Sequence, residues 1–201
     1  MADNSSVLGP SAEVLAKLSW KPIQSNMPTP RRSCAATVAE NRLLVFGGRN
    51  AALWLSAVEA YDAENDTWTI LPSMPTSRRG CAAVTIDGKV YVFGGYNGFY
   101  LSRVEVMDLV AQTWAALPFM RHKRWGCSAG VIGEFMIVVG GSDDFVNHVT
   151  AEMFNLTTQQ WEDLPKMSFP HVFGTIVVIE TRAYVFGGGN NKMEVFDLEK
   201  K

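Results

Sequence analysis

The chain has 201 residues, of which 47% are hydrophobic, 11% aromatic and 19% charged, and its formal net charge is −2. This much apolar surface excludes a largely disordered chain, and the balanced charge argues against a general nucleic-acid-binding surface. No apolar run approaches the ~20 residues needed to span a membrane, and residues 1–20 lack the pattern of a signal peptide. Three cysteines, an odd and low number, fit a reducing compartment, so we expect a cytoplasmic or nuclear protein.

The N-terminal residues 1–17 are expected to form a tail, in which Ser11 is a candidate N-cap for one short helix. The next segment, Leu18–Ile23, reads LSWKPI and has the character of a single strand that contains Trp20. No strand-like run precedes this segment in the sequence. Its interpretation therefore depends on the pattern that follows it.

From there the chain repeats. Glycine doublets follow apolar runs at Gly47, Gly94, Gly140 and Gly187, at spacings of 47, 46 and 47 residues. Four tryptophans keep the same step, with spacings of 48, 46 and 47, namely Trp20, Trp68, Trp114 and Trp161. A period in the range of roughly 20–50 residues indicates a solenoid, a propeller or an array of small units.

Each period contains four short runs with strand character. In one unit these runs are Gly80–Ile86, Val90–Gly95, Arg103–Asp108 and Thr113–Pro118. The intervening Asp87-Gly88-Lys89 has the composition of a tight hairpin turn. Helical repeats need an apolar stripe with a 3.6-residue period, and no unit has one. Four strands per period therefore predict the blade of a β-propeller.

The motifs also resemble those of the kelch-repeat family. The matching pattern is a glycine doublet after an aromatic-rich strand, then Val-Glu-x-Tyr/Phe-Asp, then a Trp about six residues before a Met. It recurs in four copies and covers nearly the whole chain after residue 18. The resemblance implies an all-β propeller whose strands are ordered from the central channel outward. It also implies more than four blades, because kelch propellers usually have more.

The number of strands in the sequence indicates how many blades this chain can form. The blades are expected at about 31–72, 78–118, 124–165 and 171–198, the last lacking its Trp-bearing strand. Adding the strand at 18–23 gives sixteen strands, which is four blades of four. We therefore predict a single propeller over 18–201, closed when the N-terminal strand completes the last blade. The alternative is an arc of a larger ring, which would expose two apolar blade faces unless chains pair.

Most recurring residues have a structural interpretation. The glycine doublets indicate close backbone approach rather than phosphate binding, and the aromatic residues of the motif are expected to fill the space between blades. Cys34, Cys81 and Cys127 recur with the period, so they either pack as small apolar residues or bring three thiols near the axis. The three histidines form no ligand set with any carboxylate at a fixed spacing, and we expect no metal and no cofactor. Trp125 breaks the tryptophan period and is not assigned to packing.

The two ends of the propeller are expected to differ in charge. Loops after the second and fourth strands of each blade share one end, here called the loop face. Its acidic loop residues are Asp143 and Asp144, whereas ten acidic residues from Glu40 to Glu199 fall at the opposite end. The basic and aromatic residues expected on the loop face are Arg31, Arg32, Arg49, Arg78, Arg79, Arg121, His122, Lys123, Arg124, His171, Trp54, Phe99, Tyr100, Trp125, Phe145 and Phe173.

Four of the basic residues are in register. The residue four positions after each recurring Met is Arg31, Arg78, Arg124 or His171. The resemblance implies that arginines before the innermost strands hold acidic peptides, and it extends only to the three arginines. The alternative is that these arginines pair with the glutamates of the repeat, Glu59, Glu105, Glu152 and Glu194, which are expected to join one blade to the next.

The predicted function is a non-enzymatic protein-interaction module that binds an acidic or phosphorylated partner segment, as in a substrate-recognition subunit. The predicted binding residues are Arg31, Arg78, Arg79, Arg124, His171, Trp125, Trp54, Tyr100 and Phe145. One alternative is a propeller enzyme of the sugar-epimerase or oxidase type with its site at the channel mouth. Another is a scaffold or cytoskeletal binder that uses the blade edges. No nucleic acid or membrane partner is expected.

Overall fold

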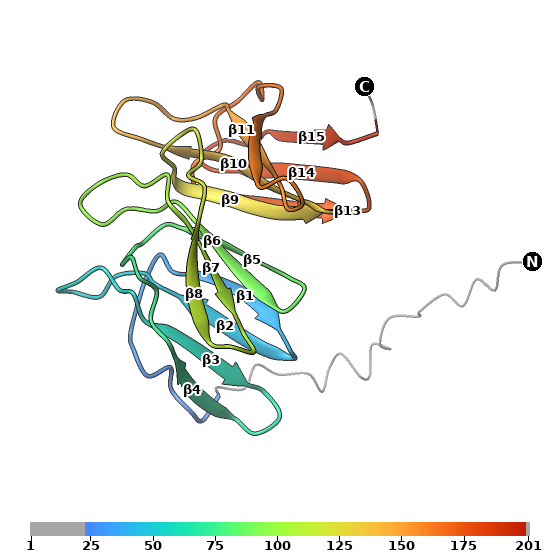
Figure 1. The fold of residues 1–201 in the computed structure, drawn as a ribbon. Coiled ribbons are helices and arrows are strands. Elements are labelled where there is room, and N and C mark those ends of the chain that lie inside the picture. The colour runs from blue at the N-terminus through green and yellow to red at the C-terminus, as the bar shows by residue number, and fades with distance from the viewer. Residues whose placement is uncertain (1–22, 200–201) are drawn as a thin grey trace, which may run out of the picture.

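The computed structural model describes residues 23–199. The chain is an all-β, four-bladed β-propeller of antiparallel sheets, which follow one another from the N-terminal to the C-terminal blade (Figure 1). The predicted fold class is therefore confirmed. Among the described residues, none belongs to a helix long and apolar enough to cross a membrane.

Each blade consists of strands in chain order, with the first strand innermost. The strands of the first two blades are β1 (Ala35–Ala39), β2 (Arg42–Phe46), β3 (Val58–Asp62), β4 (Thr67–Leu71), β5 (Ala82–Ile86), β6 (Lys89–Phe93), β7 (Val104–Asp108) and β8 (Thr113–Leu117). Those of the last two are β9 (Trp125–Ile132), β10 (Phe135–Ser142), β11 (Ala151–Asn155), β12 (Gln160–Asp163), β13 (Gly174–Ile179), β14 (Arg182–Gly187) and β15 (Met193–Asp197).

Local sequence explains these strands. The runs are rich in Val, Ile, Tyr, Phe and Thr, which suit a pleated, half-buried surface. In the predicted hairpin, Asp87 and Gly88 have φ of 49° and 69°, as a two-residue turn with both residues in the left-handed region requires. Consecutive inner strands pack against each other, β1 on β5, β5 on β9 and β9 on β13, so the blades form one arc around a common axis.

The hydrophobic core is divided among the junctions between blades. Three clusters of buried residues lie between the first and second, second and third, and third and fourth blades. The ring of Trp114 packs edge-on against Phe46 of the preceding blade, with centroids 6.4 Å apart. Trp161 does the same against Phe93 at 6.2 Å. Trp114 and Trp161 therefore fill the space between blades, as predicted, whereas the ring of Trp68 contacts Tyr61 of its own blade.

The two ends of the arc differ from these junctions. On the first blade Val38 is 66% exposed, and on the fourth blade Met193 and Val195 are 67% and 56% exposed. Within residues 23–199 the fourth sheet ends at β15. The predicted tail at 1–17 and the predicted closing strand, apart from Ile23, lie outside the described residues. The exposed end faces are those expected of the open-arc alternative, and closure by the N-terminal strand stays a prediction.

Candidate functional site

In the first three blades, the arginine before the inner strand is buried within its own blade. The side chains of Arg31, Arg78 and Arg124 are all 0% exposed. In the second blade, Arg78 Nη2 lies 2.7 Å from Glu105 Oε2, and Arg78 Nη1 donates to the carbonyl oxygens of Gly94 and Arg103 at 2.9 and 3.2 Å. The other two arginines repeat this arrangement with Glu59 and Glu152.

This geometry corrects two predictions. Arg31, Arg78 and Arg124 cannot contact a partner, because their guanidinium groups are buried and already paired with carboxylates and carbonyl oxygens. The glutamates do not join one blade to the next, because Glu105 lies on β7 and Arg78 precedes β5 of the same blade. The pair instead fixes the segment that enters each blade against the third strand of that blade.

His171 occupies the equivalent position in the fourth blade. It is 2% exposed, its Nδ1 lies 2.7 Å from the Gly187 carbonyl oxygen, and its Nε2 lies 3.3 Å from Glu194 Oε2. The imidazole thus takes the place of the guanidinium with fewer hydrogen bonds. The prediction that His171 binds a partner is therefore also wrong, because its side chain is buried.

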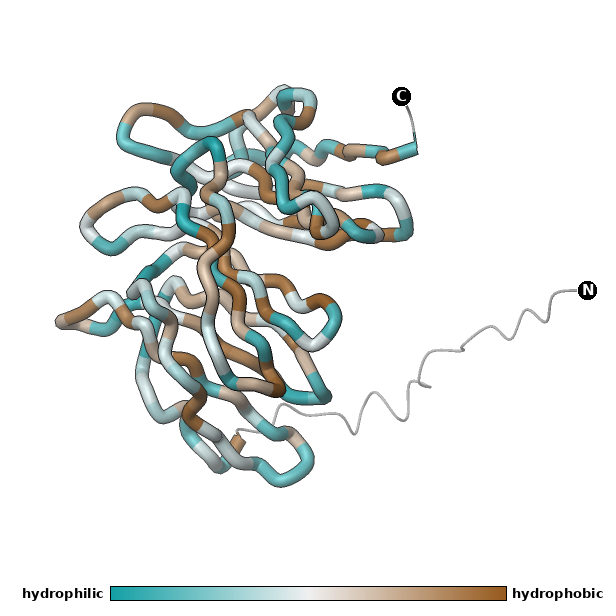
Figure 2. Tube along the Cα trace, in the orientation of Figure 1, coloured by the Kyte–Doolittle hydropathy of each residue, from teal (hydrophilic) through white to brown (hydrophobic). Residues whose placement is uncertain are grey.

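The residue after each of these positions does reach the loop face. Arg32, Arg79 and Trp125 follow Arg31, Arg78 and Arg124 directly, and each forms a backbone bridge to the strand or loop beside it. The loops that follow β2, β6 and β10 rise beside these residues, and Figure 2 shows hydrophobic stretches at their tips. The site is therefore built from equivalent short segments contributed by successive blades.

Five aromatic rings form a continuous cluster on this face. Starting from Trp54 of the first blade, each ring contacts the next at centroid distances of 4.9 to 6.4 Å. Trp54 is 41% exposed, and Phe173 is 52% exposed. We call this the aromatic cluster, and its members are Trp54, Tyr96, Tyr100, Trp125 and Phe173.

Arg79 is held inside the aromatic cluster. Its guanidinium carbon lies 5.4 Å from the centroid of Tyr96 and 5.1 Å from that of Trp125, which are cation–π distances. Arg79 Nε, Trp125 Nε1 and Asn97 Oδ1 are buried atoms without a hydrogen-bond partner. Because the guanidinium lies against two rings of the cluster, Arg79 places a positive charge within the aromatic cluster.

Two residues of this site were missed by the sequence analysis. Tyr96 and Asn97 follow the second glycine doublet directly, and that position is the signal that could have found them. Phe145, which was predicted to bind, is 89% exposed on the third-blade loop. Among the described residues it takes no part in the ring contacts of the aromatic cluster.

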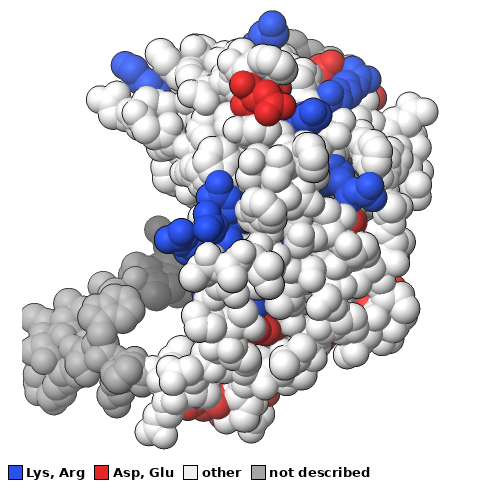
Figure 3. Space-filling view, turned by 90° about the vertical axis from the view of Figure 1, so that its left-hand side faces the viewer, with Lys and Arg blue, Asp and Glu red and all other residues white. Residues whose placement is uncertain are grey.

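The charge of the loop face is largely basic. Figure 3 looks onto it and shows several separate patches of Lys and Arg and one prominent acidic patch. Some of these bases are paired: Arg121 Nη1 lies 2.7 Å from Asp163 Oδ2, and Lys123 Nζ lies 3.9 Å from Asp144 Oδ2.

The inner strands of all four blades line a central depression. Its wall includes Cys34 and Cys81, which occupy equivalent positions of the repeat, and Ser128 and Thr175, which are equivalent to Ala35 and Ala82. Cys81 and Cys127 are buried free thiols, and burial raises their pKa values to about 11 and about 12. Cys34 is an exposed free thiol. Cys81 and Cys127 therefore pack as small apolar residues, which was one of the two interpretations.

One group of possible metal ligands was not foreseen. Ligand atoms of His122, Glu152 and Asp163 lie within 4.8 Å of one another, although the sequence spacing predicted no such set. Glu152 is already bound by the Arg124 guanidinium, and Asp163 by that of Arg121. These two positive charges neutralise the carboxylates, so the group is explained by its ion pairs.

A comparison with protein families identifies the fold. The family model described as the KLHDC2/KLHL20/DRC7 Kelch-repeats domain matches residues 13–141, more than half of the chain. The chain belongs to the kelch-repeat family. A second model, the Kelch motif, matches residues 124–168. No curated protein matches the chain at a significant level. Kelch propellers are commonly protein-interaction modules and are typically non-catalytic.

Proposed function

We propose that this kelch propeller binds an acidic or phosphorylated segment of a partner protein on its loop face, without catalysing a reaction. The observation that carries the proposal is Arg79, whose side chain is only half-buried and whose guanidinium lies against the rings of Tyr96 and Trp125 on the loop face. A carboxylate or phosphate oxygen would accept hydrogen bonds from the guanidinium of the half-buried Arg79. Charge-assisted hydrogen bonds of this kind are the stronger ones.

The remaining groups of the site favour a peptide as the ligand. The aromatic cluster offers rigid contact area, which suits residues at the centre of protein interfaces. Arg32 is exposed beside Arg49, which extends the positive charge toward the first blade.

In this proposal the bound segment belongs to a substrate protein, and the propeller is its recognition subunit. The protein then acts in the cytoplasm or nucleus, which agrees with the three free thiols Cys34, Cys81 and Cys127. Once the preferred peptide chemistry is established, affinity capture followed by mass spectrometry would identify the partner protein.

A peptide array tests the chemistry directly. Matched acidic, phosphorylated, neutral and basic peptides are probed with the wild-type chain, with Arg79→Ala and with Arg182→Ala. Arg182 is an exposed arginine at the start of β14 and is paired with Asp197 of β15. Its replacement therefore controls for the loss of one positive charge. We expect binding of acidic or phosphorylated peptides to weaken at least about tenfold in Arg79→Ala, equivalent to about 1.4 kcal/mol, and to stay unchanged in Arg182→Ala. Equal binding by both variants would refute the proposal.

A further inference from the structure

An opening on the first blade is lined by two arginines. It lies on the loop face, between the segment that enters β1 and the loop after β2, and its walls include Pro30, Arg32, Arg49, Asn50 and Ala51. Arg32 is exposed and Arg49 is half-buried. Within residues 23–199, no Asp or Glu forms an ion pair with either arginine.

The two arginines are directly opposed in a backbone bridge. The Arg32 N–H donates to the Arg49 carbonyl oxygen at 3.0 Å, and the Arg49 N–H donates to the Arg32 carbonyl oxygen at 2.9 Å. Opposed residues of an antiparallel pair place their side chains on the same face, with Cβ atoms about 4.5–5.5 Å apart, and like charges in such a pair are destabilising. An anion bound between the two guanidinium groups would remove this repulsion.

The second and third blades fill the equivalent positions differently. Arg79 is opposed to Tyr96, whose ring centroid lies 5.4 Å from the Arg79 guanidinium carbon. Trp125 is opposed to Ser142. Each of these pairs has at most one charge, so the first blade differs from the next two by placing two positive charges side by side.

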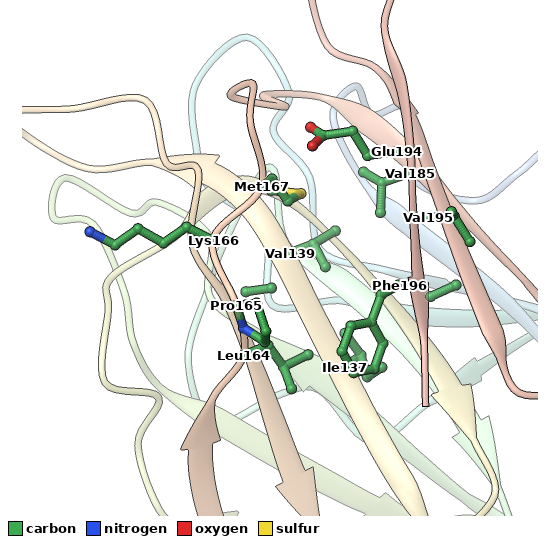
Figure 4. A pocket seen from close by; sticks show the side chains of 12 residues that line it. Ile137, Val139, Leu164, Pro165, Lys166, Met167, Val185, Glu194, Val195 and Phe196 are labelled. Atoms are coloured by element: carbon green, nitrogen blue, oxygen red, sulfur yellow. The ribbon is translucent and has the colours of Figure 1, made fainter. Parts of the chain in front are cut away.

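The apolar pocket at the junction of the third and fourth blades does not suit an anion. Figure 4 shows its walls, which include Val139, Leu164 and Phe196. Its charged lining residues, Lys166 and Glu194, have opposite signs, and the Lys166 side chain points away from the space (Figure 4). The described lining of the first-blade opening, in contrast, is basic and contains no acidic residue.

We propose that Arg32 and Arg49 bind the phosphate group of a phosphorylated residue in the partner segment. This inference rests on the proposed function and narrows its ligand from an acidic or phosphorylated segment to a phosphorylated one. A phosphate monoester carries a charge of about −1.5 to −2 at pH 7 and three acceptor oxygens, so it can accept hydrogen bonds from both guanidinium groups and neutralise them. A carboxylate carries one negative charge and two oxygens, which a single guanidinium satisfies.

The arginine pair is continuous with the aromatic cluster. Arg49 forms a second backbone bridge to Trp54, and the Trp54 ring lies 6.0 Å from the ring of Tyr96, against which Arg79 packs. The loop-face segments of the first two blades contain no Asp or Glu; they are 29–34, 47–57, 76–81 and 94–103. A segment that carries a phosphate and a carboxylate can therefore contact the arginine pair and Arg79 without repulsion from these segments.

A matched peptide series tests the phosphate assignment. The acidic peptide that binds best in the array is resynthesised with Ser, phosphoserine or Glu at each position in turn, and its binding to the full chain is measured by fluorescence anisotropy. We expect phosphoserine at one position to bind at least about tenfold more tightly than Glu at that position, because it engages both guanidinium groups.

The double variant Arg32→Ala/Arg49→Ala, whose folding is checked by thermal unfolding, should lose this preference. Its affinities for the phosphoserine and Glu peptides should differ by about twofold or less, and Arg182→Ala should keep the full preference of the wild-type chain. A wild-type chain without a preference for phosphoserine, or a double variant that keeps it, would overturn the assignment and leave the proposed function standing.

Arg79→Ala separates this inference from the proposed function. It should weaken the binding of the Ser, phosphoserine and Glu peptides by similar factors and keep the preference for phosphoserine, because it leaves the arginine pair intact. If no acidic or phosphorylated peptide bound the wild-type chain, the proposed function would be refuted and this inference with it.

A lipid headgroup could supply the same phosphate chemistry, and vesicles distinguish the two sources. Phosphatidylcholine vesicles with and without phosphatidylinositol 4-phosphate are sedimented with the wild-type chain and with the double variant. We expect the wild-type chain to sediment equally with both kinds of vesicle. Sedimentation that requires the phosphoinositide and is lost in the double variant would assign the arginine pair to a lipid and overturn the proposal.

Discussion

At the scale of single residues, the buried arginine–glutamate pair determines what each repeat can use for binding. Arg78 and Glu105 are 0% and 1% exposed, so neither charge can be offered to a partner. The neighbouring Arg79 is half-buried and faces the aromatic cluster. Two adjacent arginines therefore have opposite roles, because successive residues of an extended chain point in opposite directions.

The first residue-scale prediction concerns this pair. Replacing Arg78 with Ala leaves the Glu105 carboxylate buried without its partner, and we expect a loss of about 3–5 kcal/mol in the free energy of unfolding. Urea denaturation followed by tryptophan fluorescence measures this loss.

The matched control removes both charges at once. The double variant Arg78→Met/Glu105→Leu leaves no buried charge, so it should recover most of the stability lost in Arg78→Ala. If the single and double variants were equally unstable, the loss would come from packing rather than from the uncompensated carboxylate.

At the scale of elements, the glycine doublet controls how closely one blade approaches the next. Gly94 has a φ of +60°, and a Cβ at this position would overlap the Arg124 carbonyl oxygen. The following residue, Gly95, donates its N–H to that same carbonyl at 2.7 Å. The glycines are therefore needed both for their backbone conformation and for the contact between blades.

Gly94→Ala tests this requirement against Gly88→Ala. Gly88 also has a left-handed φ, +69°, but no atom lies within 4 Å of a Cβ added at this position. We expect Gly88→Ala to cost only the conformational penalty of about 1–2 kcal/mol, and Gly94→Ala to cost clearly more because of the backbone overlap. Thermal unfolding of both variants gives the comparison. Similar losses would mean that the blades separate easily at this contact.

At the scale of the whole molecule, the antiparallel meander separates the charges of a nearly neutral chain. The net charge is only −2, yet the loop face gathers lysines and arginines (Figure 3). A bound acidic segment would therefore be attracted by a field that added salt screens.

Binding of an acidic peptide should consequently depend on salt. The Debye length falls from about 10 Å at 0.1 M to about 3 Å at 1 M, so we expect the dissociation constant to rise by about tenfold over this range. Fluorescence anisotropy with an acidic peptide and a neutral peptide of equal length measures the difference. Salt-insensitive binding would instead favour the scaffold alternative, in which blade edges bind the partner.

The elements could be predicted because their signals are local. In the second blade the predicted strand Val90–Gly95 is observed as Lys89–Phe93, and Thr113–Pro118 as Thr113–Leu117. Strand alternation, turn residues and the repeat period all act over a few residues. The His122, Glu152 and Asp163 group could not be found in this way. Glu152 and Asp163 meet only when β11 and β12 pair, and His122 reaches them from the segment before β9.

The order of residues along the chain was enough to predict a kelch-type propeller with a basic, aromatic end. The repeat period, the strand pattern and the alternation of loops between the two ends of a blade all follow from the order of residues along the chain. The folded chain was needed to learn which arginine of each adjacent pair is accessible, that Tyr96 joins the aromatic cluster, and that a pocket lies at the junction of the third and fourth blades. Burial depends on what other segments place over a residue, and the spacing of residues along the chain does not specify that.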